Sequence, residues 1–454
     1  MRAALTAERA GVPTVSIVCA GFDGQARATA EGAGFPDAAL ATTVGHVDTQ
    51  SADEMIANFL DHTVDQIVQG LTSDTTGAAT GEHEPDVRDI VFSGPIEEVH
   101  AHFLAQGWTD GNPIIPPTIE QVEQFLATSG VDARQARGVA TSSGRSISLW
   151  SIAVNGVMAG CSPQHLGVLI ALADILADPA YGAEHSGNTT GADALAIVSG
   201  PRIGALGFNS GPGALREGHH ANTSVGRWIR LYLRNVFDFT AAEHDKATFG
   251  NPTRTVLAED MACLAEIGWE PLSALLGHSG TEDVVSMARM NSGTIIGSVF
   301  GSTPEEILPY LGNGIARTAA WDLTHVYGLG HDQFQPLLIL SPMLARLFAA
   351  AGYSKLATQE ALFETARIDA ATFEKFIGEW SNLTAGRRTL AELVAAGHLP
   401  GVFAASDDPN RLVPVVTRPE RILIAVAGDP TRANAYALSN DGPHGWWTSK
   451  PISD

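Results

Sequence analysis

A glycine-dense segment at residues 204–213 (GALGFNSGPG), called the glycine segment below, is the feature that most constrains the fold. It follows an apolar run, 195–198, that predicts a strand, and it precedes an amphipathic stretch, 223–235, that predicts a helix. Because glycine has no side chain, such a turn brings backbone amides close to an anion, which the positive end of a helix also attracts. The sequence therefore predicts a small-molecule site here, without fixing the reaction.

Length and composition indicate a globular protein of two or three domains. The chain has 454 residues, of which 44% are hydrophobic and 17% are charged. Its formal charge of −23 argues against nonspecific binding to nucleic acid or to anionic membranes, because like charges repel. An anionic substrate would need a local basic pocket, and the nearest basic cluster is Arg227, Arg230, Arg234 and Lys246. The same residues would equally suit helix caps and surface ion pairs.

The cysteines give no sign of a disulfide framework. Cys19, Cys161 and Cys263 lie far apart, without CxxC or zinc-type spacing, which fits a reducing compartment. The first residues have no apolar core ahead of a cleavage site, and no stretch has the roughly 20 apolar residues of a membrane span. We therefore expect a soluble, cytoplasmic protein, and we expect no metal site.

The chain divides into a short and a long part. Residues 1–73 predict a truncated, flavodoxin-like α/β fragment with helices at 2–10, 22–33 and 52–71 and strands at 13–19 and 39–44. Two strands are too few for a stable parallel sheet, so this fragment must complete itself against the rest of the chain or a partner. Residues 74–86 (TTGAATG within a polar stretch) predict a linker.

Residues 87–454 predict a large, multi-layer α/β domain that carries the site. The expected helices lie at 95–106, 118–129, 146–159 and 163–177, and the later expected strands lie at 294–299, 336–340 and 421–426. Alternation of this kind is typical of α/β or mixed α+β layers.

Two segments near the N-terminus, AALTAERAGVPTVSIVCAGF (3–22) and ARATAEGAGFPD (26–37), resemble the second half of the UGSC family. That family is named for a selenocysteine- or cysteine-Gly-Ser-Cys motif, and its order more distantly resembles the selenoprotein subunits of glycine and proline reductases. In the family the motif lies just upstream of this helix and strand, and the sequence here starts after that place. A late start-codon assignment, a separate dithiol subunit or loss of the chemistry would each explain this.

The longer part resembles the domain that accompanies UGSC-type segments. The similar stretches are WTDGNPIIPPT (108–118), AVNGVMAGCSP (153–163), GFNSGPGALREGHHANTSVGRWIRL (207–231), DKATFGNP (245–252) and ILIAVAGDP (422–430). The resemblance implies thiol or selenol redox chemistry as a first guess. It also marks Asn155, Asn112 and Arg227, which lie in these stretches, as substrate-binding candidates.

Cys161 is the candidate nucleophile. It lies between two predicted helices, near the start of the second, where the helix end would lower the pKa of a thiol and favour the thiolate. The alternative is a small buried residue that closes a helix junction, as is common for an unpaired cysteine.

Further candidates surround the glycine segment. His219 or His220 would serve as a general base, since imidazole titrates near neutral pH, whereas adjacent histidines point apart and poorly suit one metal. An oxyanion or carboxylate pocket would use Asn209, Ser210, Gly211 and Asn222.

Two polar turns supply acid–base candidates. Asp110 and Asn112 flank Gly111 in a proline-stiffened turn, which would hold polar side chains in place for catalysis or would be an ordinary Asx turn. Asp245 and Lys246 precede a Gly-Asn-Pro turn, and Lys246 would bind a carboxylate or form a surface ion pair.

Three functions remain open. The first is an enzyme that acts on a small polar or anionic metabolite through Cys161, with redox or elimination chemistry. The second is a thiol-independent lyase or hydratase that uses Asp110, Lys246 and a histidine. The third is a non-catalytic subunit that is completed by a partner chain, either another copy or a small dithiol-bearing subunit. The cofactor is left unknown, since neither GxGxxG nor GxxxxGK[ST] follows a predicted strand, and a GxSxG nucleophile elbow is also missing.

Overall fold

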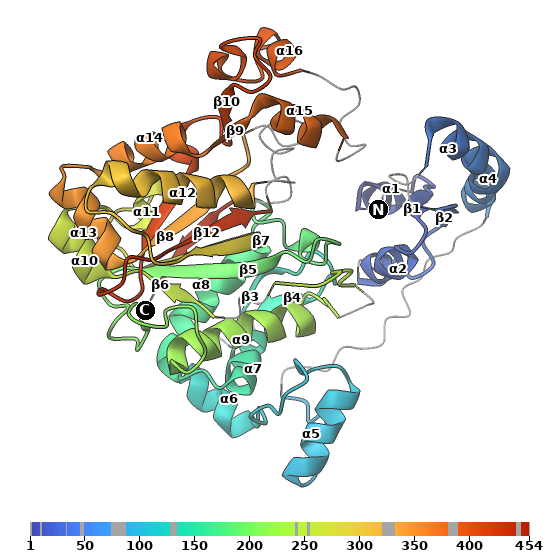
Figure 1. Cartoon of the computed structure of the whole chain (residues 1–454). Helices are drawn as coiled ribbons and strands as arrows, with labels where there is room; N and C mark the ends of the chain where they lie inside the picture. The colour runs from blue at the N-terminus through green and yellow to red at the C-terminus, as the bar shows by residue number, and fades with distance from the viewer. Residues whose placement is uncertain are drawn as a thin grey trace.

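The computed structural model confirms the mixed α/β class (Figure 1). It describes residues 2–9, 11–32, 34–45, 50–73, 88–127, 133, 135–240, 244–251, 255–319, 332–379, 389–441 and 446–453. The predicted linker at 74–86 lies outside these residues.

The N-terminal segment is a small two-layer unit. In order it contains α1 (Arg2–Arg9), β1 (Ser16–Cys19), α2 (Asp23–Gly32), β2 (Leu40–Thr43), α3 (Ala52–Asn58), the π-helical η2 (Phe59–Thr63) and α4 (Val64–Thr72). β1 and β2 pair in parallel, as the predicted fragment requires. The helix expected over 52–71 is therefore interrupted by a π-helical turn. It begins where Ser51 and Glu54 form a reciprocal capping box.

This unit leaves much apolar surface uncovered. Leu5, Ala30 and Ala41 are buried, but Ile17 on β1 is exposed, as are side chains on α3, η2 and α4. The exposed residues on those three elements are Met55, Ile56, Leu60, Val68 and Leu71. Small two-stranded units are marginal on their own, and this exposure agrees with the expectation that the fragment needs a partner surface.

A seven-stranded mixed sheet forms the centre of the long part. Its strands are β5 (Asp193–Ser199), β6 (Leu257–Ala258), β7 (Val284–Ile296), β8 (Leu337–Leu340), β11 (Leu423–Val426), β12 (Ala435–Asn440) and β13 (Thr448–Pro451). The order is β11-β8-β12-β7-β5-β6. β13 pairs with the first residues of β7, on the same edge of β7 as β12, which pairs with its later residues. The strand expected at 294–299 begins ten residues earlier, at Val284. The prediction missed its first half because Ser286 and Arg289, both buried, interrupt the apolar pattern that is typical of a buried strand.

The sheet is open and strongly curled. Its edge strands β6 and β11 approach each other at one point, where the Asp260 amide donates to the Val426 carbonyl over 2.8 Å. Alternate side chains fill an inner core, including Leu195, Ile197 and Ile339. The other faces of the same strands pack against two outer clusters of buried residues.

Helices cover the two outer clusters. One side carries α5 (Ile96–Ala105), α6 (Ile119–Leu126), α7 (Leu149–Ala159), α8 (Leu166–Ala177) and α9 (His220–Asn235), with 3₁₀ turns η3 (Pro163–His165) and η4 (Ala183–His185). The other carries α10 (Met261–Ile267), α12 (Pro304–Thr318), α13 (Pro342–Ala350), α14 (Lys355–Thr365), α15 (Ala370–Glu379) and α16 (Leu390–Ala395). The short α11 (Leu272–Leu275) instead packs on the inner core through Leu272. In Figure 1, α12 and α9 lie on opposite sides of the sheet.

Two short antiparallel pairs complete the fold. β3 (Ala136–Val139) pairs with β4 (Ser146–Ser148), and β9 (Arg367–Asp369) pairs with β10 (Leu412–Pro414). The 3₁₀ turns η6 (Gly401–Ala404) and η7 (Pro419–Arg421) lie before and after β10. The helix expected over 146–159 therefore starts three residues late. Ser148 caps it by accepting the Ser151 amide, which ends the strand and begins α7.

Candidate functional site

The glycine segment lies between β5 and α9, as predicted, but its polar groups bind one another. Fully buried Asn222 accepts the Asn209 amide over 2.8 Å and donates to the carbonyls of Asn209 and Val256 over 3.0 and 2.8 Å. The Asn209 side chain in turn accepts the Gly211 amide over 3.1 Å, and the Ser210 carbonyl accepts Gly428 N–H over 2.7 Å. This geometry gives the four predicted anion-binding residues a structural role.

Cys161 has the opposite pKa shift to the one expected at a helix start. It lies in the turn between α7 and α8 and is buried in the outer cluster of this side. Burial raises the pKa of its thiol to about 12, and a hydrogen bond with Ser224 only partly offsets this. The expectation of a lowered thiol pKa is wrong, because apolar surroundings penalise the thiolate and the 3₁₀ turn η3 intervenes before α8.

The two predicted histidines begin α9. His219 occupies the N-cap position without a side-chain capping bond, and the Nε2 atom of His220 lies 2.9 Å from the Gly160 carbonyl oxygen. His165, whose ring centroid is 5.9 Å from that of His220, contacts the Leu206 carbonyl over 3.0 Å. The fold thus brings His220, the Cys161 turn and the glycine segment together. None of the three hollows described next is lined by Cys161 or His220.

A polar hollow of about 400 Å³ lies beside the last turns of α9 and the start of β5. We call it the arginine hollow, because Arg230, Arg234 and Arg289 line it, together with Asp110, Asp193, Asp245, Ser186, Phe239, Phe249 and Asn251. Arg230 and Arg234 are four residues apart on α9, so they project from one helix face. Two residues of the basic cluster predicted from the sequence, Arg230 and Arg234, therefore border a cavity, whereas Arg227 and Lys246 do not line it.

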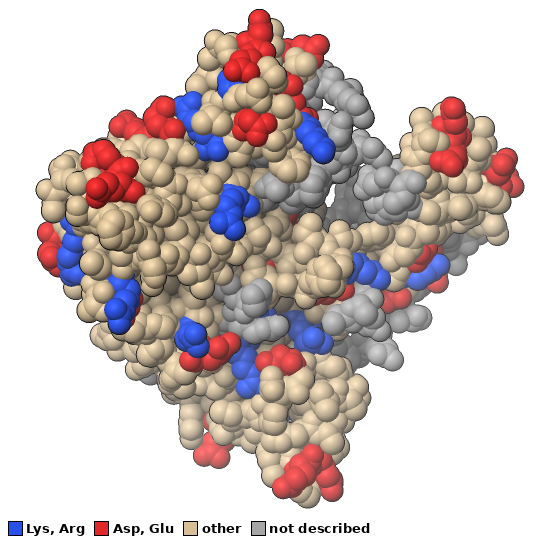
Figure 2. All heavy atoms as spheres, in the orientation of Figure 1, with Lys and Arg blue, Asp and Glu red and all other residues tan. Residues whose placement is uncertain are grey.

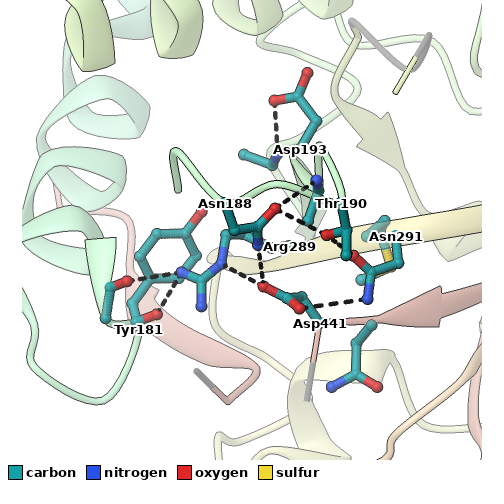
Figure 3. Close-up of polar contacts among 12 residues, drawn as sticks. Tyr181, Asn188, Thr190, Asp193, Arg289, Asn291 and Asp441 are labelled. Atoms are coloured by element: carbon teal, nitrogen blue, oxygen red, sulfur yellow. Dashed lines mark hydrogen bonds and ion pairs between the residues drawn. The ribbon is translucent and has the colours of Figure 1, made fainter. Parts of the chain in front are cut away.

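Two of the three arginines that line this hollow, Arg230 and Arg289, form ion pairs within the protein. Arg230 forms an ion pair with Asp193. Arg289, with only 2% of its side chain exposed, lies 3.5 Å from an Asp441 oxygen and donates to the carbonyls of Tyr181 and Gly182 over 2.8 and 2.9 Å. Its guanidinium also lies over the Tyr181 ring, 5.0 Å from the centroid. Figure 3 shows Arg289 between Tyr181 and Asp441.

Amide and hydroxyl groups form a network around Asp441, the acidic partner of Arg289. Asp441 accepts Nδ2 of Asn188 over 2.6 Å and Nδ2 of Asn291 over 3.3 Å (Figure 3). Thr190 bridges the two asparagines, and the Asn188 oxygen also accepts the Gly191 amide. Because the network holds Asp441 in place, it also orients Arg289, which lines the arginine hollow.

Arg234 differs from its neighbours. Its Nη1 donates to the Gly107 carbonyl over 3.3 Å, and no carboxylate in the described part of the chain lies within 4.0 Å of it as an ion-pair partner. Because Arg234 borders the hollow and has no ion-pair partner among the described residues, its guanidinium is the group there best able to receive the anion of a ligand.

Asp110 and Arg227 form a two-point ion pair at the side of the same hollow. Nε and Nη2 of Arg227 donate to the two carboxylate oxygens over 3.0 and 2.9 Å. Burial opposes ionisation of Asp110, but the hydrogen bonds and the charge of Arg227 outweigh it and lower the pKa of the carboxyl. Arg227 also donates to the Pro113 carbonyl, so it anchors the turn that carries Asn112. The Asx-turn alternative for this segment is supported by the bond from Asn112 N–H to Asp110, at 3.4 Å.

Neither Asn155 nor Lys246 lines the arginine hollow. Asn155 is buried and joins α7 to α9, because its Oδ1 accepts Nδ2 of Asn235 over 2.8 Å. Lys246 lies in loop 244–251, whose residues 245, 247 and 249–251 line the arginine hollow.

Two glycines set the position of loop 244–251. A Cβ on Gly191 would lie 2.6 Å from the Gly250 nitrogen, and a Cβ on Gly187 would lie 2.3 Å from the His244 oxygen. The close approach lets the Lys246 amide donate to Gly187 O over 3.1 Å. The loop thereby forms one wall of the hollow and presents Phe249, which is 96% exposed.

A second hollow of about 410 Å³, the histidine hollow, adjoins the first. It is lined by Ser142, Glu184, His185, Phe237, Asp238, Phe239 and His244 and, from α2, by Gln25, Ala28 and Thr29. A third, smaller hollow of about 180 Å³ lies at the ends of β8 and β11, where Gly428 and Asp429 follow the predicted strand. Phe239 lines both larger hollows.

Sequence reasoning missed Arg289, Asp441 and the residues of the histidine hollow. A charged residue within the apolar run of β7 was a usable signal for Arg289. Nothing in the sequence pointed to Asp441, which lies more than 150 residues later and meets Arg289 only because β12 pairs with β7.

The described residues offer neither a metal-binding cluster nor a helix suited to a membrane. No group of three or more His, Cys, Asp and Glu side chains there is arranged to hold a metal ion. Nor does that part of the chain contain a helix with the length and apolarity to cross a membrane.

Comparison with curated proteins finds no match. The N-terminal part does match a family model. Residues 1–73 match the UGSC family, so the chain carries a UGSC-family segment ahead of a much longer region that the match does not cover.

Proposed function

We propose that this protein is a cytoplasmic enzyme that binds a small anionic metabolite in the arginine hollow and acts on it by thiol-independent acid–base chemistry, as a lyase or hydratase does. The observation that carries the proposal is Arg234, a guanidinium that borders the hollow without a carboxylate partner among the described residues. A ligand carboxylate would give it the charge-assisted hydrogen bonds that its neighbours already have.

The distribution of charge supports an anionic ligand. The whole chain has a formal charge of −23, which repels anions, so a site for them must concentrate cations locally. In the view of Figure 2, acidic side chains gather over α16, α5 and the α3–α4 end, and several basic ones lie nearer the middle. Three arginines and three aspartates line one hollow of about 400 Å³, a volume suited to a small molecule. Two of the aspartates, Asp110 and Asp193, are paired with Arg227 and Arg230.

The state of Cys161 favours chemistry without a thiol. A thiol with a pKa of about 12 leaves only about one molecule in 10⁵ as thiolate at pH 7. The residue lines neither larger hollow. This argument ranks the lyase or hydratase hypothesis above the Cys161 nucleophile.

Asp245 is the proposed proton-transfer group. Its carboxylate lines the arginine hollow, and one oxygen accepts the Ala247 amide over 3.0 Å, which fixes its orientation. Asp110 suits this role less well, because Arg227 holds its pKa low and favours the ionised form. We assign Asp110 and Arg227 to shaping the hollow, and Lys246 to the loop that carries Asp245.

Calorimetric titration with a panel of small carboxylates, followed by a turnover screen, tests the proposal. The informative variant is Arg234→Gln, which removes the cation and keeps a polar side chain. A matched control is Arg346→Gln, which removes an exposed arginine of α13 that pairs with Glu266 of α10. We expect carboxylate affinity to fall about tenfold or more in the first and to stay unchanged in the second. Equal affinity in both variants would refute the arginine hollow as the anion site.

A second candidate function is that of a subunit completed by a partner chain. The exposed apolar side chains on the N-terminal segment, such as Ile17, Ile56 and Leu60, favour it. Sedimentation of the purified chain would show a homo-oligomer or a monomer, and Leu60→Glu would dissociate an assembly that uses this face. A monomer with full turnover would exclude this alternative.

A further inference from the structure

The arginine and histidine hollows are neighbours that share one wall. Phe239 lines both. Along the chain, Glu184 and His185 face the histidine hollow and Ser186 faces the arginine hollow, and His244 and Asp245 are divided in the same way. Because residues that follow one another in the sequence line different hollows, the two hollows are only about one side chain apart.

The two hollows differ in charge. In the arginine hollow, Asp110 and Asp193 are paired with Arg227 and Arg230, and Arg234 lacks a carboxylate partner in the described part of the chain. The histidine hollow is lined by Glu184 and Asp238 and by no Lys or Arg. Arg145, which does not line this hollow, lies 3.7 Å from one Asp238 oxygen, and His244 lies 3.9 Å from the other. With two carboxylates near one arginine, this side of Phe239 favours a cation, whereas Arg234 favours an anion on the other side.

The backbone around Asp238 is built to hold that carboxylate in place. Asp238 has φ of +63°, in the left-handed region that non-glycine residues rarely adopt. The hydroxyl of Ser142 donates to the Phe237 carbonyl, and that of Ser143 donates to the Val236 carbonyl over 2.5 Å. Strained residues that their surroundings hold in place are concentrated at functional sites, which agrees with a ligand contact here.

We infer that the two hollows form one elongated site for a zwitterionic ligand, an amino acid whose carboxylate and ammonium groups lie at opposite ends of an apolar chain. Its carboxylate binds Arg234, its ammonium group binds between Glu184 and Asp238, and its methylene groups pack on Phe239. The inference deepens the proposed function and rests on it, because it takes the arginine hollow as the anion site.

The UGSC-family segment forms part of this site. Gln25, Ala28 and Thr29 of α2 line the histidine hollow together with Ser142, which follows β3 in the long region (Figure 1). The ammonium end of the ligand therefore lies between the two parts of the chain. This gives the N-terminal segment a direct role in ligand recognition.

Calorimetric titration of the full chain with three probes tests the inference: 6-aminohexanoate, hexanoate and hexylamine. We expect 6-aminohexanoate to bind about tenfold more tightly than hexanoate, since its ammonium group adds a charge-assisted contact. Glu184→Gln and Asp238→Asn, of which the second keeps a residue that tolerates positive φ, should abolish this difference and leave hexanoate affinity unchanged. Glu360→Gln, which removes an exposed acid on α14, is the control for net charge.

The outcomes separate the two proposals. If hexanoate binds as tightly as 6-aminohexanoate and Arg234→Gln weakens both, the elongated site is refuted and the anion site stands. If none of the probes binds, both are refuted. Ala28→Trp, which adds bulk from α2 to the histidine hollow, should weaken 6-aminohexanoate alone. Unchanged binding in that variant would refute the role of the N-terminal segment.

Discussion

Asp110 and Arg227 are separated by 117 positions and meet through two parallel hydrogen bonds of 2.9 and 3.0 Å. The pair joins the proline-stiffened turn after α5 to the middle of α9. Arg227 precedes Arg230 and Arg234 on the same helix. The ion pair that fixes Arg227 therefore also fixes the face of α9 that borders the arginine hollow. The contact thus links the stability of the fold to the shape of the candidate site.

Substitution Asp110→Asn should destabilise the protein by about 1–3 kcal/mol, because it leaves a half-buried guanidinium with a weaker acceptor. Urea unfolding measures the change. The control is Glu266→Gln, which breaks the exposed pair with Arg346 and should cost less than about 1 kcal/mol. Similar losses in the two variants would show that the Asp110 pair contributes no more than a surface pair.

The same pair gives a pH dependence of definite sign. The folded state lowers the pKa of Asp110, so the pair stabilises the protein above the unfolded pKa of about 3.9. This contribution is lost as the pH falls through the lower folded pKa. The stability difference between the wild type and Asp110→Asn should therefore be constant from pH 7 to about 5 and vanish on acidification below about 4. A difference that grew on acidification would contradict this origin.

The sequence predicted the parts of this site better than their pairing. The spacing of Arg227, Arg230 and Arg234 was enough to place them on one helix face, because helical geometry is local. That Asp110 would meet Arg227 was not predictable, because it depends on how a distant turn packs on α9. The glycine segment shows the same limit: its strand, turn and helix were predicted, whereas Asn222 turns inward to reach Val256, a contact set by β6.

Thiol reactivity should follow burial. With iodoacetamide at pH 8 the half-buried Cys19 should react first, whereas Cys161 and Cys263 should react only on unfolding. Burial raises the thiol pKa to about 12 for Cys161 and to about 11 for Cys263. Peptide mass spectrometry after timed quenching follows each site separately. Rapid labelling of Cys161 in the native protein would restore the nucleophile hypothesis that we rank second.

Substitution Arg289→Met should cost about 3–5 kcal/mol, because it leaves Asp441, with 3% of its side chain exposed, as an uncompensated buried charge. The double variant Arg289→Met/Asp441→Asn should recover part of the loss, since neither charge is then buried alone. Arg137→Met is the control, because its pair with Asp174 is more exposed. Chemical denaturation of the wild type, Arg289→Met, Asp441→Asn and the double variant gives the coupling energy, and a value near zero would contradict the assigned network.

Substitution Gly191→Ala should weaken carboxylate binding through the position of loop 244–251. The new Cβ would lie 2.6 Å from the Gly250 nitrogen, and Gly191 has φ of +79°, so the loop must move away and the backbone is strained. Asp245 moves with that wall of the arginine hollow, and affinity should fall about tenfold or more. Gly204→Ala is the matched control, because a Cβ there meets nothing within 4 Å. That control also separates the two sites considered for the ligand. If Gly204→Ala reduced binding and Gly191→Ala did not, the ligand would bind at the glycine segment, as the sequence alone suggested.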